Sequence, residues 1–178
     1  MRTQFDIDRL RDDFRQYCIW DPCKPSPTLF RFIIYFIKMP EFRSVVYYRI
    51  GWASKLASWL FRPQACLFIN CPNIASGLHI QHGFSTIISA KEIGANCHIH
   101  QQVTVGWSTG GNPIIGKNVR INAGAIVIGG IVIGDDVEIA AGSVVTKDVP
   151  SHTMVAGVPA KPIKCRSEMS ESWKRIQE

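Results

Sequence analysis

Four histidines lie within one short stretch of this sequence, where they could act as bases or as metal ligands. They are His79, His82, His98 and His100. A neutral imidazole within hydrogen-bonding reach of a hydroxyl group can remove its proton while the oxygen attacks an activated carbonyl. Three imidazoles brought together can instead hold zinc. Which chemistry is available depends on the elements that position the four rings.

A repeat of six residues must position most of these side chains. Aliphatic residues recur at this spacing with two longer steps, one of seven residues and one of ten, at Ile74, Ile80, Ile87, Ile93, Ile99, Val105, Ile115, Ile121, Val127, Ile133, Ile139 and Val145. A period of six fits neither an α-helix, at about 3.6 residues per turn, nor the alternating faces of a sandwich strand. It is typical of short parallel strands wound into a triangular solenoid with three hexads per coil.

Three hexads per coil place the hexads that begin at positions 80, 99, 121 and 139 on one face. Their third residues are His82, Gln101, Ala123 and Ala141, and their fourth residues are Gly83, Gln102, Gly124 and Gly142. Glycine and alanine leave main-chain N–H and C=O groups open to a ligand. We therefore expect a long, thin ligand along this strip, with its reactive end at His82.

The ten-residue step, between Val105 and Ile115, predicts a loop that leaves the solenoid. Loops on a rigid scaffold commonly carry function. Trp107 in this loop offers a flat apolar face that can stack on a sugar ring, although it could also simply pack beneath the loop.

The front of the chain has the pattern of helices. Residues 3–18, 28–38 and 41–60 are expected to be helical, with Pro40 at a boundary. The sequence thus predicts a mainly β protein with a short α-helical N-terminal segment, and hexapeptide repeats of this kind resemble the left-handed parallel β-helix. The expected domains are a helical segment at 1–65, the β-helix at 66–164 and a tail at 165–178.

Composition limits the classes of protein to which the chain can belong. Its 178 residues are 46% hydrophobic and 19% charged, which suits one domain with a sizeable core. Lys and Arg outnumber Asp and Glu by 20 to 14, mainly in the front third. No helix-turn-helix, zinc-finger or aromatic-interleaved basic motif accompanies this charge, so nucleic acid is not an expected partner.

The basic, apolar region at 28–62 has two possible explanations. Its longest apolar run, residues 29–37, is too short to cross a bilayer, which takes about twenty residues. The region can contact an anionic membrane surface peripherally, or it can pack against the end of the β-helix or a neighbouring subunit. The charged first residues lack the apolar run of a secretory signal, which predicts a cytoplasmic protein with free thiols.

Several motifs resemble those of serine O-acetyltransferases, a family of hexapeptide-repeat enzymes. They are Gly77-Leu78-His79-Ile80-Gln81-His82-Gly83, Gln102-Val103-Thr104-Val105-Gly106, the segment 139–150, and Ala156-Gly157-Val158-Pro159-Ala160. The resemblance implies a homotrimer with acetyl-CoA in the grooves between subunits and direct acetyl transfer to a hydroxyl group. It makes His82 the catalytic base. The implied cofactor contacts are Ala123, Gly124, Ala141, Gly142, Thr146, Lys147 and Lys161.

The sequence departs from this family at two places in the expected site. Gln81 stands where the family has an aspartate, and no Asp or Glu occurs from 42 to 91, so an amide, a main-chain carbonyl or a distant acid such as Glu92 must orient His82. The family's Arg-His pair is missing from the loop at 106–113. The acceptor therefore stays open between L-serine and a saccharide hydroxyl of a surface-polysaccharide pathway, with Gln101 and Trp107 as candidate contacts.

Two other functions remain as alternatives. The first is a catalytically silent hexapeptide scaffold that binds a membrane or a protein partner through its front segment. The second is a zinc enzyme similar to the γ-type carbonic anhydrases, whose fold is the same. The histidine spacing does not match that family, and we expect no metal.

Overall fold

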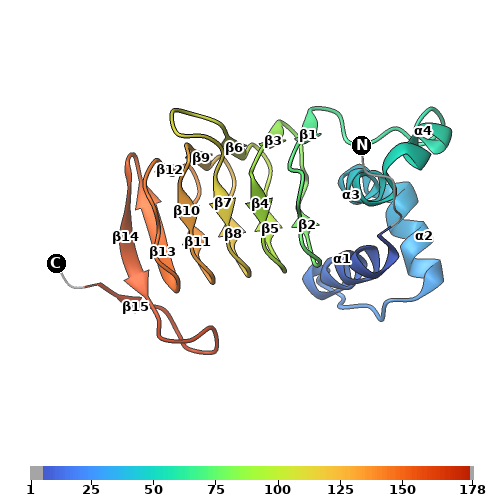
Figure 1. The fold of residues 1–178 in the computed structure, drawn as a ribbon. Coiled ribbons are helices and arrows are strands. Elements are labelled where there is room, and N and C mark those ends of the chain that lie inside the picture. Colours follow the sequence, from blue (N-terminus) through green and yellow to red (C-terminus); the bar gives the residue numbers. More distant parts are fainter. Residues whose placement is uncertain (1–5, 177–178) are drawn as a thin grey trace.

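Four short helices form one end of the molecule (Figure 1). The computed structural model describes residues 6–176. The helices are α1 (Ile7–Trp20), α2 (Leu29–Lys38), α3 (Pro40–Ile50) and α4 (Ser54–Ala57), with a 3-10 turn, η1 (Gly51–Ala53), before α4. Asp6 and Thr28 cap α1 and α2 by accepting a hydrogen bond from the backbone three residues on.

The predicted helices are confirmed, with differences at their ends. The first helix extends two residues beyond the expected end, and residues 3–5 lie outside the described part. The third does not run through to residue 60, because Gly51 closes α3 with a φ of 59°.

The rest of the chain is a parallel β-helix whose strands form three sheets. Sheet A has the order β1-β3-β6-β9-β12, sheet B the order β10-β7-β4, and sheet C the order β15-β14-β13-β11-β8-β5-β2. The bounds are β1 (Leu67–Ile69), β2 (His79–Ile80), β3 (Thr86–Ile88), β4 (Glu92–Ile93), β5 (His98–Ile99), β6 (Thr104–Gly106), β7 (Ile114–Ile115), β8 (Arg120–Ile121), β9 (Ile126–Ile128), β10 (Val132–Ile133), β11 (Glu138–Ile139), β12 (Val144–Val145), β13 (Thr153–Gly157), β14 (Ala160–Cys165) and β15 (Lys174–Arg175).

The predicted stacking of three hexads per coil is confirmed in sheet C, where Ile80, Ile99, Ile121 and Ile139 pair in sequence. The expected phase is wrong in one coil. Ile88, not Ile87, points inward and pairs with Val105, and Ile87 is 41% exposed. The turn after Ile80 is two residues longer than a hexad allows.

This longer turn moves His82 out of the column in which we expected it. The backbone N–H of Gln102 donates to the carbonyl of Phe84, and those of Gly124 and Gly142 donate to the carbonyls of Gln101 and Ala123. The corner column is therefore Phe84, Gln101, Ala123 and Ala141. His82 lies beside this column, two residues earlier in the turn.

An antiparallel hairpin of β13 and β14, followed by β15, covers the end of the β-helix away from the helices (Figure 1). Two cores result, one inside the β-helix and a smaller aromatic one among the helices around Phe14, Tyr35 and Phe42. Helix α4 ends at Ala57, β1 begins at Leu67 and β14 ends at Cys165; the division into domains stays a prediction. Within residues 6–176, no helix is both long and apolar enough to span a bilayer.

Buried polar contacts fasten the helices to the first coil. The Arg49 guanidinium donates to both oxygens of Asp13, at 2.7 and 3.1 Å, and to the carbonyls of Ile74 and Ala75. The Asp13 carboxylate also accepts from the N–H of Leu78 at 2.8 Å. Both side chains of this ion pair are fully buried. The helices therefore fix the backbone that leads into β2.

Candidate active site

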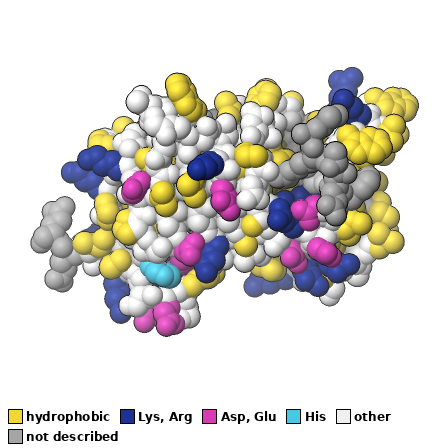
Figure 2. Space-filling model, in the orientation of Figure 1, with side chains coloured by type: hydrophobic (Ala, Val, Ile, Leu, Met, Phe, Trp, Pro, Cys, Tyr) yellow, Lys and Arg dark blue, Asp and Glu magenta, His cyan; other side chains and the backbone are white. Residues whose placement is uncertain are grey.

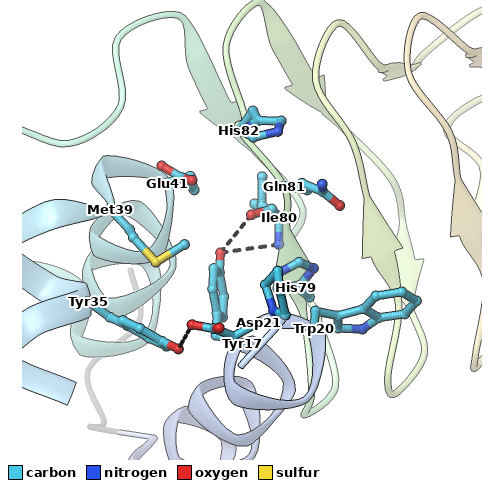
Figure 3. Close-up of a pocket in the computed structure, with 11 residues that line it drawn as sticks. Tyr17, Trp20, Asp21, Tyr35, Met39, Glu41, His79, Ile80, Gln81 and His82 are labelled. Carbon is cyan, nitrogen blue, oxygen red and sulfur yellow. Dashed lines mark hydrogen bonds between the residues drawn. The ribbon is translucent and has the colours of Figure 1, made fainter. Parts of the chain in front are cut away.

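A pocket of about 180 Å³ opens beside His82, where the helices meet β2 (Figure 3). The end of α1, the start of α3 and the strand–turn segment at 79–82 each provide one wall. Its lining residues are Tyr17, Trp20, Asp21, Pro22, Tyr35, Met39, Glu41, His79, Ile80, Gln81 and His82. Of these, sequence reasoning identified only His82 as a site residue.

His82 sits in an unusual turn that presents its ring to solvent. Its φ is 65° and that of Gly83 is 59°, so two consecutive residues are left-handed. Such a conformation is uncommon for a residue with a side chain and persists where the surroundings impose it. Tyr17 holds the strand just before the turn, because its hydroxyl donates to the carbonyl of Ile80 and accepts from its N–H.

Two carboxylates line the pocket, and only one of them is engaged. Asp21 accepts hydrogen bonds from the Tyr35 hydroxyl, at 2.5 Å, and from the N–H of Cys23, and the Tyr35 bond is the main cause that lowers the pKa of Asp21. Glu41 is only 8% exposed, yet among the described residues its carboxylate has neither a hydrogen bond nor an ion pair. Its carboxylate oxygens are not among the fully buried atoms without a partner, so they face the pocket that Glu41 lines.

Glu41 also packs against the turn that carries the proposed base. A methyl group added at Gly83 would lie 3.2 Å from the Glu41 Cβ. In Figure 3, Glu41 and His82 occupy the same end of the pocket. The distant acid suggested by the sequence, Glu92, is instead in sheet B, accepts from the Asn73 amide and does not line the pocket.

His79 and His98 form an aromatic wall with Trp20. The rings of His79 and His98 are 4.4 Å apart, and Trp20 lies 4.2 Å from His98. Burial lowers the pKa of His79 to about 3 and that of His98 to about 2, so both rings are neutral at pH 7. The part of the chain that the structure describes has no group of three or more His, Cys, Asp or Glu placed to hold a metal.

The predicted cofactor residues lie at two places on the β-helix. Ala123, Gly124, Ala141 and Gly142 form the corner between sheets C and A, and the N–H of Gly157 donates to the Ser143 hydroxyl, which holds the β13–β14 hairpin above this corner. A methyl group added at Gly142 would meet nothing within 4 Å. Lys161 lies in that hairpin. Thr146 and Lys147 instead follow β12, so they lie at the other end of the sheet A strands from this corner.

The two candidate acceptor contacts do not line the pocket of this chain. Trp107 is 72% exposed on its loop, so the alternative that it packs beneath the loop is wrong. Reciprocal backbone bonds between Ser108 and Gly111 close the loop, and Asn112 anchors it to Ser89. Gln101 lies at the corner, where its buried side-chain oxygen has no hydrogen-bond partner within residues 6–176.

Comparison with known proteins relates this geometry to acetyl-transfer enzymes. Residues 112–147 match the family model described as bacterial transferase hexapeptide (six repeats). A serine acetyltransferase of Synechococcus elongatus is 43% identical over 95 residues, which is 51% of this chain and 39% of that protein. The matched region thus spans less than half of that relative.

Solved structures extend the similarity into the helices. Serine acetyltransferase of Neisseria gonorrhoeae, in complex with serine, superposes with a TM-score of 0.70 at 27% identity, over 88% of this chain and 68% of that one. The enzyme of Brucella abortus strain S19, in complex with coenzyme A, gives a TM-score of 0.64 at 29% identity, over 88% and 67%. The chain is thus similar to hexapeptide-repeat serine acetyltransferases, in sequence over about half of its length and in fold over most of it.

Proposed function

We propose that the protein is an acetyl-CoA-dependent O-acetyltransferase and that His82 is its catalytic base. The observation that carries this proposal is the exposed imidazole in a left-handed turn at the mouth of a pocket, beside an open corner of small residues. The relatives solved with serine and with coenzyme A support it. Following the family resemblance, we also propose a cytoplasmic homotrimer with acetyl-CoA in the grooves between subunits.

The proposed reaction needs one proton carrier. The neutral ring of His82 removes the proton of the acceptor hydroxyl while the oxygen attacks the thioester carbonyl carbon. The C–S bond then breaks, and the imidazolium returns the proton to the departing CoA sulfur. Backbone N–H groups of the corner or of the loop at 106–113 would stabilise the negative charge on the carbonyl oxygen.

We propose Glu41 as the positioning residue for His82. Its carboxylate lines the pocket without a partner among the described residues, and its Cβ lies next to Gly83 in the turn that carries His82. Its charge also contributes to the pKa of Tyr17, which burial raises well above its usual value. A hydrogen bond from the imidazole to this carboxylate would fix the ring and stabilise its protonated form during transfer.

Replacing Glu41 by glutamine is expected to lower kcat about 10- to 150-fold, because a hydrogen bond to a charged group contributes about 1.5–3 kcal/mol. The KM values should change little. The melting temperature should also stay near that of the wild type. A purely structural role for Glu41 would instead lower the melting temperature or raise the KM values along with the loss in kcat. Glu92→Gln is the matched control and should behave as wild type.

The charges of the pocket bear on the identity of the acceptor. Among the described residues, its lining contains two carboxylates but no lysine or arginine. Arg120, a candidate cation in the solenoid, lies over the Trp20 ring at 4.7 Å and forms an ion pair with Glu138. We therefore propose an acceptor hydroxyl on a molecule without a carboxylate, such as a saccharide. L-serine, named for the relatives, is the competing acceptor.

A CoA-release assay with serine and with free or nucleotide-linked sugars separates these acceptors. A sugar should be the better substrate, and Trp107→Ala should raise its KM about tenfold, which corresponds to about 1.4 kcal/mol. Serine acetylation with kcat/KM above about 10⁴ M⁻¹s⁻¹ would contradict the proposed acceptor. Absence of both CoA binding and CoA release would favour the silent scaffold.

A bulky residue in the corner column should block the cofactor. Ala141→Trp is expected to weaken CoA binding at least about tenfold, because the side chain fills the open strip. Its melting temperature should stay near that of the wild type, since the added ring points away from the core. Val132→Trp, on the exposed face of sheet B, is the control. Wild-type CoA affinity of Ala141→Trp, measured by calorimetry, would rule out this corner as the cofactor site.

A further inference from the structure

The outer face of α2 exposes four large hydrophobic side chains. Leu29 and Phe30 are 76% and 73% exposed, and Ile33 and Ile37 are 47% and 54% exposed. Leu29, Ile33 and Ile37 are four residues apart, so they form one stripe along the helix. The inner face of α2, by contrast, packs Phe32 and Tyr35 into the aromatic core.

A second exposed apolar cluster lies between the end of α3 and the first strand. Trp52, Leu56, Trp59 and Leu60 are 52%, 73%, 76% and 61% exposed. The rings of Phe36 and Phe61 contact each other at 5.6 Å, which joins this cluster to α2. We call the eight exposed residues the helical-end surface. Figure 2 shows hydrophobic side chains over this end of the molecule, together with Lys or Arg and some Asp or Glu side chains.

Cations outnumber acids around the helical-end surface, where Asp21 of the α1 cap lies close enough to Arg31 to interact with it. Arg31, Lys38, Lys55 and Arg62 border it with partly or fully exposed side chains. Residues 28–62 contain one acid, Glu41, which is buried in the pocket. The surface is therefore apolar and cationic.

Charge decides which occupant suits this surface. In a symmetric contact between two copies, the four cations of each would face those of the other, and like charges in an interface are strongly unfavourable. An anionic lipid bilayer offers the complementary charge over a wide area and an apolar interior for leucine, isoleucine and phenylalanine. Trp52 and Trp59 are of the type enriched at the membrane–water interface.

We propose that the helical-end surface docks the protein peripherally on an anionic membrane. The helices lie at the end opposite the β13–β14 hairpin, so docking leaves the β-helix projecting away from the bilayer (Figure 1). This proposal does not depend on the acetyl-transfer reaction.

Sedimentation of the full chain with phospholipid vesicles tests the proposal. Binding to vesicles that contain phosphatidylglycerol should exceed binding to pure phosphatidylcholine at least tenfold and should weaken with added salt. Lys38→Glu/Lys55→Glu should reduce it about tenfold or more. Lys91→Glu/Arg175→Glu makes the same change in net charge on the β-helix and its cap and should have little effect. Leu56→Ser/Trp59→Ser should also reduce binding, with the melting temperature measured to confirm folding.

Three results would overturn the proposal. One is equal binding to both kinds of vesicle, and another is no binding to either. The third is concentration-dependent self-association, seen by sedimentation velocity without lipid and removed by Leu56→Ser/Trp59→Ser. That result would assign the surface to a second copy of the chain.

Discussion

Replacing His82 by alanine is expected to lower kcat by about 10²–10⁴, because the acceptor hydroxyl loses the group that removes its proton. The affinity for acetyl-CoA should change little, since the corner that we propose for the cofactor lies in later coils. The first of those coils, which contains Ala123, lies two strand spacings from the coil of His82, and Ala141 lies three spacings away, or about 14 Å at about 4.8 Å each. The loss should therefore appear in kcat and kcat/KM to a similar extent.

Two controls separate the loss of a base from a disturbed turn. His152→Ala removes an imidazole in the terminal cap, where it contacts Asp136, and should leave turnover unchanged. His82→Asn keeps a polar side chain, and asparagine tolerates a left-handed backbone, so it should retain the fold and still lose activity. Unchanged turnover in His82→Ala would show that another group is the base.

The β-helix could be predicted from sequence because burial alone sets its pattern. Each inward position must hold an aliphatic residue, and the hexad repeat places such a residue every six positions over several coils. The one error arose at Ile87 and Ile88, where two adjacent residues are equally apolar. The apolar pattern therefore could not show that the turn before Ile88 is two residues longer than in a regular hexad. This turn carries His82.

The helical wall of the site could not be predicted in the same way. Its residues meet β2 through tertiary contacts that have no sequence period. Glu41 lies immediately before the stretch from 42 to 91 that contains no Asp or Glu, and no sequence pattern places it against Gly83. Arg49 of α3 likewise holds the first coil through the carbonyls of Ile74 and Ala75, a contact that no sequence period predicts.

Replacing Arg49 by methionine is expected to destabilise the protein by about 3–5 kcal/mol, because it leaves the buried Asp13 carboxylate without its partner. Burial is the largest influence on the pKa of Asp13 and raises it, while Arg49 and the N–H of Leu78 act in the opposite direction. The carbonyl of Ala75 would also lose its guanidinium donor. Urea unfolding monitored by circular dichroism measures the difference.

The matched control is Arg15→Met, which removes an exposed ion pair with Asp12 on the same helix as Asp13. Such surface pairs contribute about 0–1 kcal/mol, so the midpoint should barely move. Arg49→Lys should recover only part of the loss, because an ammonium group cannot make the paired hydrogen bonds of a guanidinium. If Arg49→Met cost no more than Arg15→Met, the ion pair would not be what fastens the helices to the first coil. The position of the pocket relative to His82 would then depend on Tyr17 and its two bonds to Ile80.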